Sequence, residues 1–321
     1  MNIGKRIGLQ TGKATRDAFG EALLELGRED PSIVVVDGDV HNSTRTEYFA
    51  REFPDRFFNV GIAESNMVGV AAGLAACGKK AFVSSFACFL MNNAFDQLRM
   101  CVAFPLQNVK AVGSHAGISI GEDGPSQMGI EDIALASALP GFKVFVPADE
   151  HAARALTRLM AEVKGPAYMR TGRPGFPLVY DADARFAVGK ANQLREGSDL
   201  TIVGTGLMVA ASLEAAHLLS EDGIQVRVLD MHTIKPLDEE AIVAAAIQTG
   251  CIVCAEEHLL CGGLGSEVAR VIGRTHPVPM EFVGIRDTYA TSGPPDALLE
   301  YYGLTADHIV EACRSALARK G

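Results

Sequence analysis

A glycine-rich loop, residues 113–127, holds the densest group of side chains that can do chemistry, in the order GSHAGISIGEDGPSQ. His115, Asp123 and Gln127 are spread among its four glycines. Long segments of this kind in compact domains are usually functional. Imidazole, carboxylate and amide groups bind hydroxyl and carbonyl oxygens and can exchange protons with them. The loop is therefore the first candidate for a binding site.

Glu64 is a second candidate, because it begins a helical pattern directly after an apolar segment. An acidic residue in a first turn is common, since it stabilises the helix dipole. The alternative is a partly buried carboxyl group that shares or donates a proton. The residues alone leave both interpretations open and favour the first.

Alternating strands and helices must position these groups. Apolar β-branched runs predict strands, and 3.6-residue periodicity predicts helices between them. The predicted strands are residues 33–36, 81–85, 108–112, 143–146, 167–170, 200–203, 225–229 and 251–255; the predicted helices are residues 14–27, 64–76, 89–103, 150–163, 209–220, 239–248 and 265–274. This alternation indicates an α/β fold of two domains, each with a mainly parallel sheet covered by helices.

A change in composition over residues 171–198, where prolines, glycines and charges gather, marks the domain boundary. We place the linker at residues 181–198, between a first domain of residues 1–180 and a second of residues 199–321. Ligands of parallel sheets bind outside the carboxyl ends of the strands. The loops to watch are therefore residues 37–45, 60–66, 113–127 and 170–173.

The overall composition limits the partners. Lys and Arg number 29 against 39 Asp and Glu, for a net charge of -10. This balance argues against a nucleic-acid surface and against binding to an anionic membrane. The apolar runs are shorter than the roughly 20 residues that span a bilayer, and no targeting segment is visible. With seven cysteines set mostly in apolar runs, we expect a cytoplasmic protein with reduced thiols.

Three further patterns have weaker interpretations. Cys251, Cys254, His258 and Cys261 superficially resemble a zinc site. The odd spacing of the first two, within a strand, puts their side chains on opposite faces, which disfavours zinc. The glycines at 204–206 lack the third glycine of a dinucleotide fingerprint, so a tight turn is favoured. Those at 262–265 favour close packing over anion binding.

Eight ordered blocks resemble transketolase, with similar spacing. They are residues 14–20, 37–44, 62–67, 85–89, 94–100, 113–115, 121–128 and 233–238. The resemblance covers essentially the whole chain and corresponds to the family's pyrimidine-binding and C-terminal domains. It implies thiamine diphosphate as cofactor.

The resemblance also implies roles in cofactor binding. In the family a glutamate hydrogen-bonds the aminopyrimidine of the cofactor and so assists removal of the thiazolium proton, and Glu64 matches it. An aromatic ring stacks on the pyrimidine; Phe89 matches best and Phe86 is near. Ordinary core packing is the alternative for both rings. Compared with the family pattern, this chain has one extra residue between Phe89 and the block at 94–100.

Substrate contacts are implied in the same way. Arg16, Ser43, His115 and Arg170 match residues that hold a sugar phosphate, and the planar fork of arginine suits phosphate. A surface ion pair is the alternative for Arg170.

Two more positions complete the implied site. Asp123 matches the residue that holds a substrate hydroxyl group, and Gln127 stands where some members have histidine. The resemblance thus implies Glu64, His115 and Gln127 as catalytic residues.

One family feature has no counterpart. Transketolases bind the diphosphate and Mg²⁺ through a Gly-Asp-Gly motif and a later asparagine on an N-terminal domain. Residues 37–39 are the nearest match but belong to another block. We therefore expect a separate N-terminal subunit to hold the metal and diphosphate, in a heterotetramer, with a homodimer for the chain alone.

The sequence thus predicts the C-terminal subunit of a transketolase, which moves a two-carbon ketol unit between sugar phosphates. The sugars themselves stay open. Alternatives are the β subunit of a 2-oxoacid dehydrogenase, 1-deoxyxylulose-5-phosphate synthase, and a catalytically silent scaffolding half. The group at His115, Asp123 and Arg170 favours transketolase, because decarboxylation of a 2-oxoacid needs no sugar-phosphate cradle.

Overall fold

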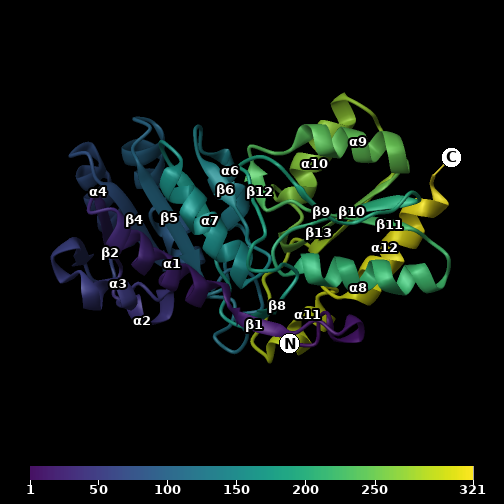
Figure 1. Ribbon diagram of the computed structural model, residues 1–321, viewed down its shortest axis with the longest axis horizontal. Coiled ribbons are helices and arrows are strands. Elements are labelled where there is room, and N and C mark those ends of the chain that lie inside the picture. The colour runs from purple at the N-terminus through teal and green to yellow at the C-terminus, as the bar shows by residue number, and fades with distance from the viewer. Residues whose placement is uncertain (321) are drawn as a thin grey trace.

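The computed structural model describes residues 1–320 and shows two α/β halves side by side (Figure 1). In Figure 1 the purple-to-teal half lies on the left and the green-to-yellow half on the right. The mainly parallel sheets and covering helices confirm the predicted fold class.

The first half is built on a seven-stranded sheet of order β12-β6-β7-β5-β4-β2-β3. Its strands are β2 (Ile33–Asp37), β3 (Phe57–Asn59), β4 (Lys80–Phe86), β5 (Val109–Ser114), β6 (Lys143–Phe145), β7 (Ala167–Arg170) and β12 (Thr233–Lys235). Helices α1 (Thr15–Glu29) and α7 (Glu150–Glu162) cover one face, and α4 (Glu64–Ala76) and α6 (Asp132–Ala138) cover the other. The short helices α2 (His41–Thr44), α3 (Glu47–Glu52) and η2 (Pro54–Arg56) join β2 to β3.

The second half has a five-stranded sheet of order β14-β13-β10-β11-β9, in which only β9 is antiparallel. Its strands are β9 (Asn192–Arg195), β10 (Leu200–Gly204), β11 (Val226–Asp230), β13 (Ile252–Leu259) and β14 (Met280–Ile285). One face carries α8 (Met208–Glu221), α11 (Pro295–Tyr301) and α12 (Ala306–Ala318), and the other carries α9 (Glu239–Thr249) and α10 (Leu264–Arg274). As the strand period requires, Cys251 and Cys254 pack into different cores.

The two halves share structure. Strand β12, from the second half of the chain, pairs antiparallel with β6 at the edge of the first sheet. Near the N-terminus, η1 (Lys5–Ile7) is followed by β1 (Thr11–Ala14), which pairs with β8 (Gly175–Pro177). In the other direction, Ile118 and Ile120 from the first half lie in the core of the second. The boundary is therefore crossed in both directions.

The predicted helix at residues 89–103 is the main local difference. The structure has wide π turns at η3 (Phe89–Asn93) and η4 (Leu98–Ala103), with one short α turn, α5 (Phe95–Gln97), between them. A π turn accommodates one more residue than an α turn, and π turns occur often at functional sites. Such a turn has room for the extra residue that the resemblance implies before position 94.

Among the helices described for residues 1–320, none has the length and apolar content to cross a bilayer.

Candidate active site

Most of the candidate residues lie at the carboxyl edge of the first sheet, where β2, β4 and β5 end. They are Arg16 at the start of α1, Ser43 after β2, Glu64 at the start of α4, Phe86 at the end of β4, Phe89 in η3 and His115 after β5. This is the edge at which parallel sheets bind ligands.

Glu64 is a buried carboxyl group, with 4% of its surface exposed. The Ser85 hydroxyl donates to Oε1 at 3.2 Å, and the Asn93 amide donates to Oε2 at 3.0 Å. Asn93 reaches the carboxyl group from the π turn η3. Each oxygen thus has one fixed donor, so the carboxyl group is held in one orientation.

Three rings stack at the same edge of the sheet. The centroids of Phe86 and Phe89 are 5.5 Å apart with planes at 7°, and those of Phe86 and His115 are 3.9 Å apart at 14°. Both phenylalanine rings remain half-buried. Flat apolar surfaces of this kind suit a planar heteroaromatic ligand.

His115 is neutral and fixed at both ring nitrogens. Burial, with the charge of Arg16 next in weight, lowers its pKa to about 3. Arg16 Nη1 lies 3.0 Å from Nε2, and Ser114 Oγ lies 2.7 Å from Nδ1. Because a guanidinium only donates, Nε2 must accept and Nδ1 must carry the proton. A left-handed backbone, with φ at 60°, aims the ring toward Arg16.

Positive charge gathers around Arg16. Its Nη1 donates to the Ser43 carbonyl at 3.0 Å, and its Nε is buried without a partner. Burial lowers the pKa of Arg16, and the nearby charges of Arg45 and Arg173 lower it further. Among residues 1–320, Arg16 has no carboxylate partner, whereas Arg45 pairs with Asp17 and Arg173 pairs with Asp123. An anion would therefore be stabilised here mainly by Arg16, with the partly exposed Arg173 beside it.

Asp37 explains how the loop after β2 is shaped. Its buried carboxylate accepts hydrogen bonds from the Val40 amide and from the hydroxyl groups of Thr44 and Thr46, all at 2.8 Å. These bonds fix the turn that presents Ser43 and Arg45 to Arg16. The carboxylate of Asp37, the first residue of the Asp-Gly-Asp segment at 37–39, is therefore occupied by hydrogen bonds within its own loop.

The glycine-rich loop carries Asp123 close to Arg173. Arg173 Nη1 lies 3.2 Å from Asp123 Oδ1 and donates to the Ile120 carbonyl at 2.9 Å. Both side chains are partly exposed. Gln127 lies four residues further along, half-buried, and its amide oxygen accepts a hydrogen bond from Ser126.

Arg170 does not join this group. It is only 6% exposed, and its Nη1 and Nη2 donate to the carbonyls of Glu257 at 3.0 Å and Gly129 at 2.8 Å. Its Nε lies 3.1 Å from the buried carboxylate of Asp132. The guanidinium is therefore occupied by the protein itself, which contradicts the alternative of a surface ion pair and leaves little for a phosphate.

A second arginine, Arg173, lies near Arg16 and Asp123. The distinguishing signal is the strand end: β7 finishes at Arg170, whose side chain still packs inside, whereas Arg173 lies in the loop beyond it. The same rule finds Arg45 beyond β2. Both lie in loops that the sequence pointed to, residues 37–45 and 170–173, but neither was predicted as a site residue.

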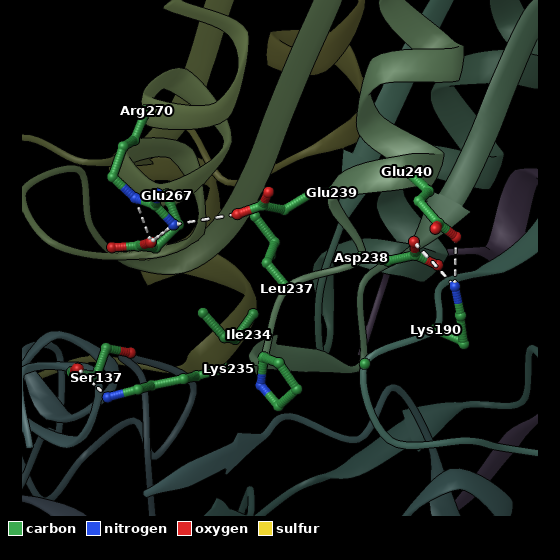
Figure 2. Close-up of a pocket in the computed structure, with 12 residues that line it drawn as sticks. Ser137, Lys190, Ile234, Lys235, Leu237, Asp238, Glu239, Glu240, Glu267 and Arg270 are labelled. Atoms are coloured by element: carbon green, nitrogen blue, oxygen red, sulfur yellow. Dashed lines mark hydrogen bonds and ion pairs between the residues drawn. The ribbon is translucent and has the colours of Figure 1, made fainter. Parts of the chain in front are cut away.

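A hollow of about 560 Å³ lies elsewhere, between β12 and the starts of α9 and α10 (Figure 2). Its charges are already paired: Arg270 with Glu267, and Lys190 with Glu240. Lys235 Nζ donates to two carbonyls of the first half, those of Ser137 and Leu139. None of the predicted site residues lines it. We place the candidate site at the sheet edge because the oriented groups of Glu64 and His115 are found there, together with Arg16, whose Nε is buried without a partner.

Comparisons with known proteins agree with this geometry. The family model for the transketolase pyrimidine binding domain matches residues 11–177, and that for the transketolase C-terminal domain matches residues 189–309. A putative transketolase C-terminal section from Methanocaldococcus jannaschii is 43% identical over 302 residues, covering 93% of this chain and 95% of its own length. A 6-deoxy-6-sulfo-D-fructose transketolase subunit from Clostridium is 41% identical over 305 residues, covering 95% of both. A solved split-gene transketolase, described as an inactive β4 tetramer, superposes with a TM-score of 0.91 at 49% identity, covering 97% of this chain and all of its own.

Proposed function

This chain belongs to the transketolase family, and from that premise we propose that it is the C-terminal subunit of a split, thiamine diphosphate-dependent transketolase. The reaction is transfer of a two-carbon ketol unit from a ketose phosphate to an aldose phosphate. The similar lengths of the relatives named as a section or a subunit support this proposal.

One observation carries the proposal: a buried, fixed carboxyl group and a stack of rings lie at the same edge of the first sheet. Glu64 and the rings of Phe86 and Phe89 form a proton partner and a wall for an aminopyrimidine. Thiamine diphosphate, when bound, supplies the carbon nucleophile that ketose cleavage requires. Glu64 would hold a proton at the pyrimidine nitrogen, and the rings would fix the plane of that heterocycle.

The substrate would lie along the arginine cluster. We assign its terminal anionic group to Arg16 and Arg173, with the Ser43 loop beside them, in place of the Arg170 contact that the resemblance implies. Asp123 would hold a hydroxyl group. His115, being neutral, would act through hydrogen bonds rather than charge. Gln127 keeps the amide role near the reacting carbonyl that the resemblance implies.

A partner subunit would complete the site. We propose that it supplies the diphosphate-binding domain and Mg²⁺, because the rings of Phe86 and Phe89 remain half-buried at the sheet edge and are open to a second protein. Ile62, two residues before Glu64, is 82% exposed. A large apolar group left in water near a site favours docking of a second protein.

Assembly and location follow as parts of the same proposal. Two copies of each subunit would form the active enzyme. The chain alone would self-associate without activity, in the manner of the inactive β4 tetramer of the solved split-gene relative. The seven cysteines are all free thiols, which supports a reducing, cytoplasmic setting.

A sulfonated sugar is a specific second candidate for the substrate. The Clostridium relative is named for 6-deoxy-6-sulfo-D-fructose. A sulfonate offers three oxygens of one shared negative charge, and the fork of Arg16 and Arg173 would accept it as it accepts phosphate.

The test is a ketol-transfer assay with thiamine diphosphate, Mg²⁺, an aldose phosphate and either a pentulose phosphate or the sulfonated ketose. We expect activity only when the chain is mixed with a candidate N-terminal subunit. Glu64→Gln should lower kcat at least about 100-fold in the mixture, because the amide cannot exchange the proton. Glu300→Gln, on the exposed surface of α11, is the matched control.

Activity in the isolated chain would contradict the shared site. Decarboxylation of a 2-oxoacid by the mixture, without ketol transfer, would redirect the assignment. Full activity of Glu64→Gln would instead support a scaffolding role.

A further inference from the structure

The loop that carries His115 and Asp123 packs on the core of the other half of the molecule. Ile118, Ile120 and Met128 are at most 3% exposed and belong to the core formed by α8, β10 and β13. A loop on a protein surface is normally held by its own domain. Here the apolar side chains of a first-half loop are buried by the second half.

Polar contacts repeat the pattern. The Ser119 amide donates to Glu257 Oε1 at 2.6 Å, with both groups buried. At the end of the loop, the Leu259 amide of β13 donates to the Ile130 carbonyl at 2.9 Å. Arg170 joins the two halves, because its guanidinium contacts the carbonyls of both Gly129 and Glu257.

Glycines let the loop approach closely. A Cβ atom on Gly117 would lie 2.2 Å from the Glu257 carboxyl carbon, and the residue has φ at +80°. Gly121 and Gly124 lie on either side of Asp123. A Cβ atom on Gly121 would lie 3.0 Å from Pro295 Cγ, and one on Gly124 would lie 2.4 Å from Ser292 Oγ, both in the second half. Side chains at these positions would push the loop away from the second half.

The position of Glu257 has a topological meaning. It lies near the carboxyl end of β13, next to β10 at the centre of the second sheet. The crevice outside such strand ends is where parallel sheets hold ligands. In this molecule the crevice holds the substrate loop.

We propose that Glu257 is a positioning residue for the substrate: by holding the Ser119 amide it fixes the loop on which His115 and Asp123 meet the sugar. Ser119 lies four residues from each of them along the loop. The inference rests on the proposed function for the identity of the substrate, but the contact it describes belongs to this chain alone. The second half of the molecule thereby fixes the conformation of a site loop that belongs to the first half.

Kinetics of the two-chain enzyme provide the first test, at temperatures well below the Tm of every variant. Glu257→Ala should raise KM for the ketose phosphate about tenfold, because an ordered substrate contact is lost. Glu257→Gln should recover most of that loss, because its amide oxygen still accepts from Ser119.

Glu256→Ala is the matched control. Glu256 is an equally buried neighbour whose carboxylate accepts from the Leu264 and Gly265 amides at the start of α10, away from the loop. This variant should lower Tm and leave KM within about twofold. Equal KM changes in the two alanine variants would show a general loss of stability and would overturn the proposal.

Hydrogen exchange and NMR of the full isolated chain provide a test that needs no activity. In Glu257→Ala, exchange of the Ser119 amide should rise at least about tenfold, and the ring resonances of His115 should shift. In Glu256→Ala the rise should fall on the Leu264 and Gly265 amides instead. An unchanged Ser119 amide or unchanged His115 signals in Glu257→Ala would overturn the proposal. A wild-type mixture without ketol transfer would refute the proposed function, and these two signals would still decide the positioning role.

Discussion

At the scale of single residues, two arginines three positions apart have opposite surroundings. Arg170 ends a strand and is enclosed by Asp132 and two carbonyls, whereas Arg173 lies in the following loop beside Asp123. Residue type is the same in both, so type alone cannot predict which guanidinium the protein encloses and which it leaves partly exposed. The strand end separates them.

The two arginines should respond differently to replacement. Arg173→Ala should raise KM for the phosphorylated substrate at least about tenfold with little change in Tm, because a partly exposed binding charge is lost. Arg170→Ala should cost about 3–5 kcal/mol of stability, because it leaves the Asp132 carboxylate buried without its partner. Steady-state kinetics and denaturant unfolding measure both effects. A rise in KM for Arg170→Ala alone would restore Arg170 as the phosphate contact.

Asp230 predicts how stability depends on pH. Burial raises its pKa to about 8, and the Tyr180 hydroxyl donates to it at 2.6 Å. Unfolded, its pKa is about 4. The folded state therefore keeps a proton that the unfolded state releases, so this residue lowers stability as pH rises from about 4 to about 8. Asp230→Asn should remove that dependence.

Denaturant unfolding at pH 5 and pH 8 tests the sign. At pH 8 the asparagine variant should be more stable than wild type by about 1–3 kcal/mol, and the gap should narrow at pH 5. A gap of the same size at both values would contradict ionisation as its cause.

Some residues could be placed from sequence and others could not. Glu64, Phe86, Phe89 and His115 follow apolar strands, and the structure brings them to one sheet edge. The burial of Arg170 depends on Glu257, 87 residues away. Local pattern contains no information on such a contact.

At the scale of elements, periodicity predicted eight buried strands and most of the long helices, but not the short or edge strands β3, β9, β12 and β14, nor the π turns. Helical periodicity is averaged over several turns, so one added residue changes it little. The added residue has a local effect, because η3 carries both Phe89 and Asn93, and Asn93 reaches Glu64.

Deleting the exposed Asn92 should convert η3 toward an ordinary α turn. The fold should remain, with Tm within a few degrees, because no buried apolar side chain is lost. Asn93 would rotate away from Glu64, and kcat should fall at least about tenfold. Asn92→Ala, which preserves the length, is the control; equal activity in the deletion and the control would refute a role for the π turn.

At the scale of the whole molecule, predicted units and observed cores differ. Composition predicts a boundary at 181–198, yet β12 from beyond it completes the first sheet and Ile118 from before it enters the second core. Strand pairing between distant segments leaves no trace in composition. The predicted boundary at 181–198 thus divides the sequence, but segments on each side of it pack into the other half.

The exposed apolar side chain of Ile62 leads to a prediction on assembly with the N-terminal subunit. Ile62→Ser should weaken association with the N-terminal subunit at least about tenfold and leave the Tm of the isolated chain unchanged, because Ile62 contributes little to this chain's own core. Ile247→Ser, at 61% exposure on α9 of the other half, is the matched control. Titration calorimetry measures both, and equal weakening would argue against a local interface at Ile62.

The packing of the glycine-rich loop on the second half of the molecule has a consequence for ancestry and for engineering. A recombination event that replaced residues 189–309 with the corresponding part of a distant relative would replace Glu257 and the core around Ile118 as well. The donor segment would then alter the recipient's sugar preference without touching a residue that meets the sugar. Chimaeras built at this junction should inherit specificity from both parents, and natural lineages should exchange the two segments together.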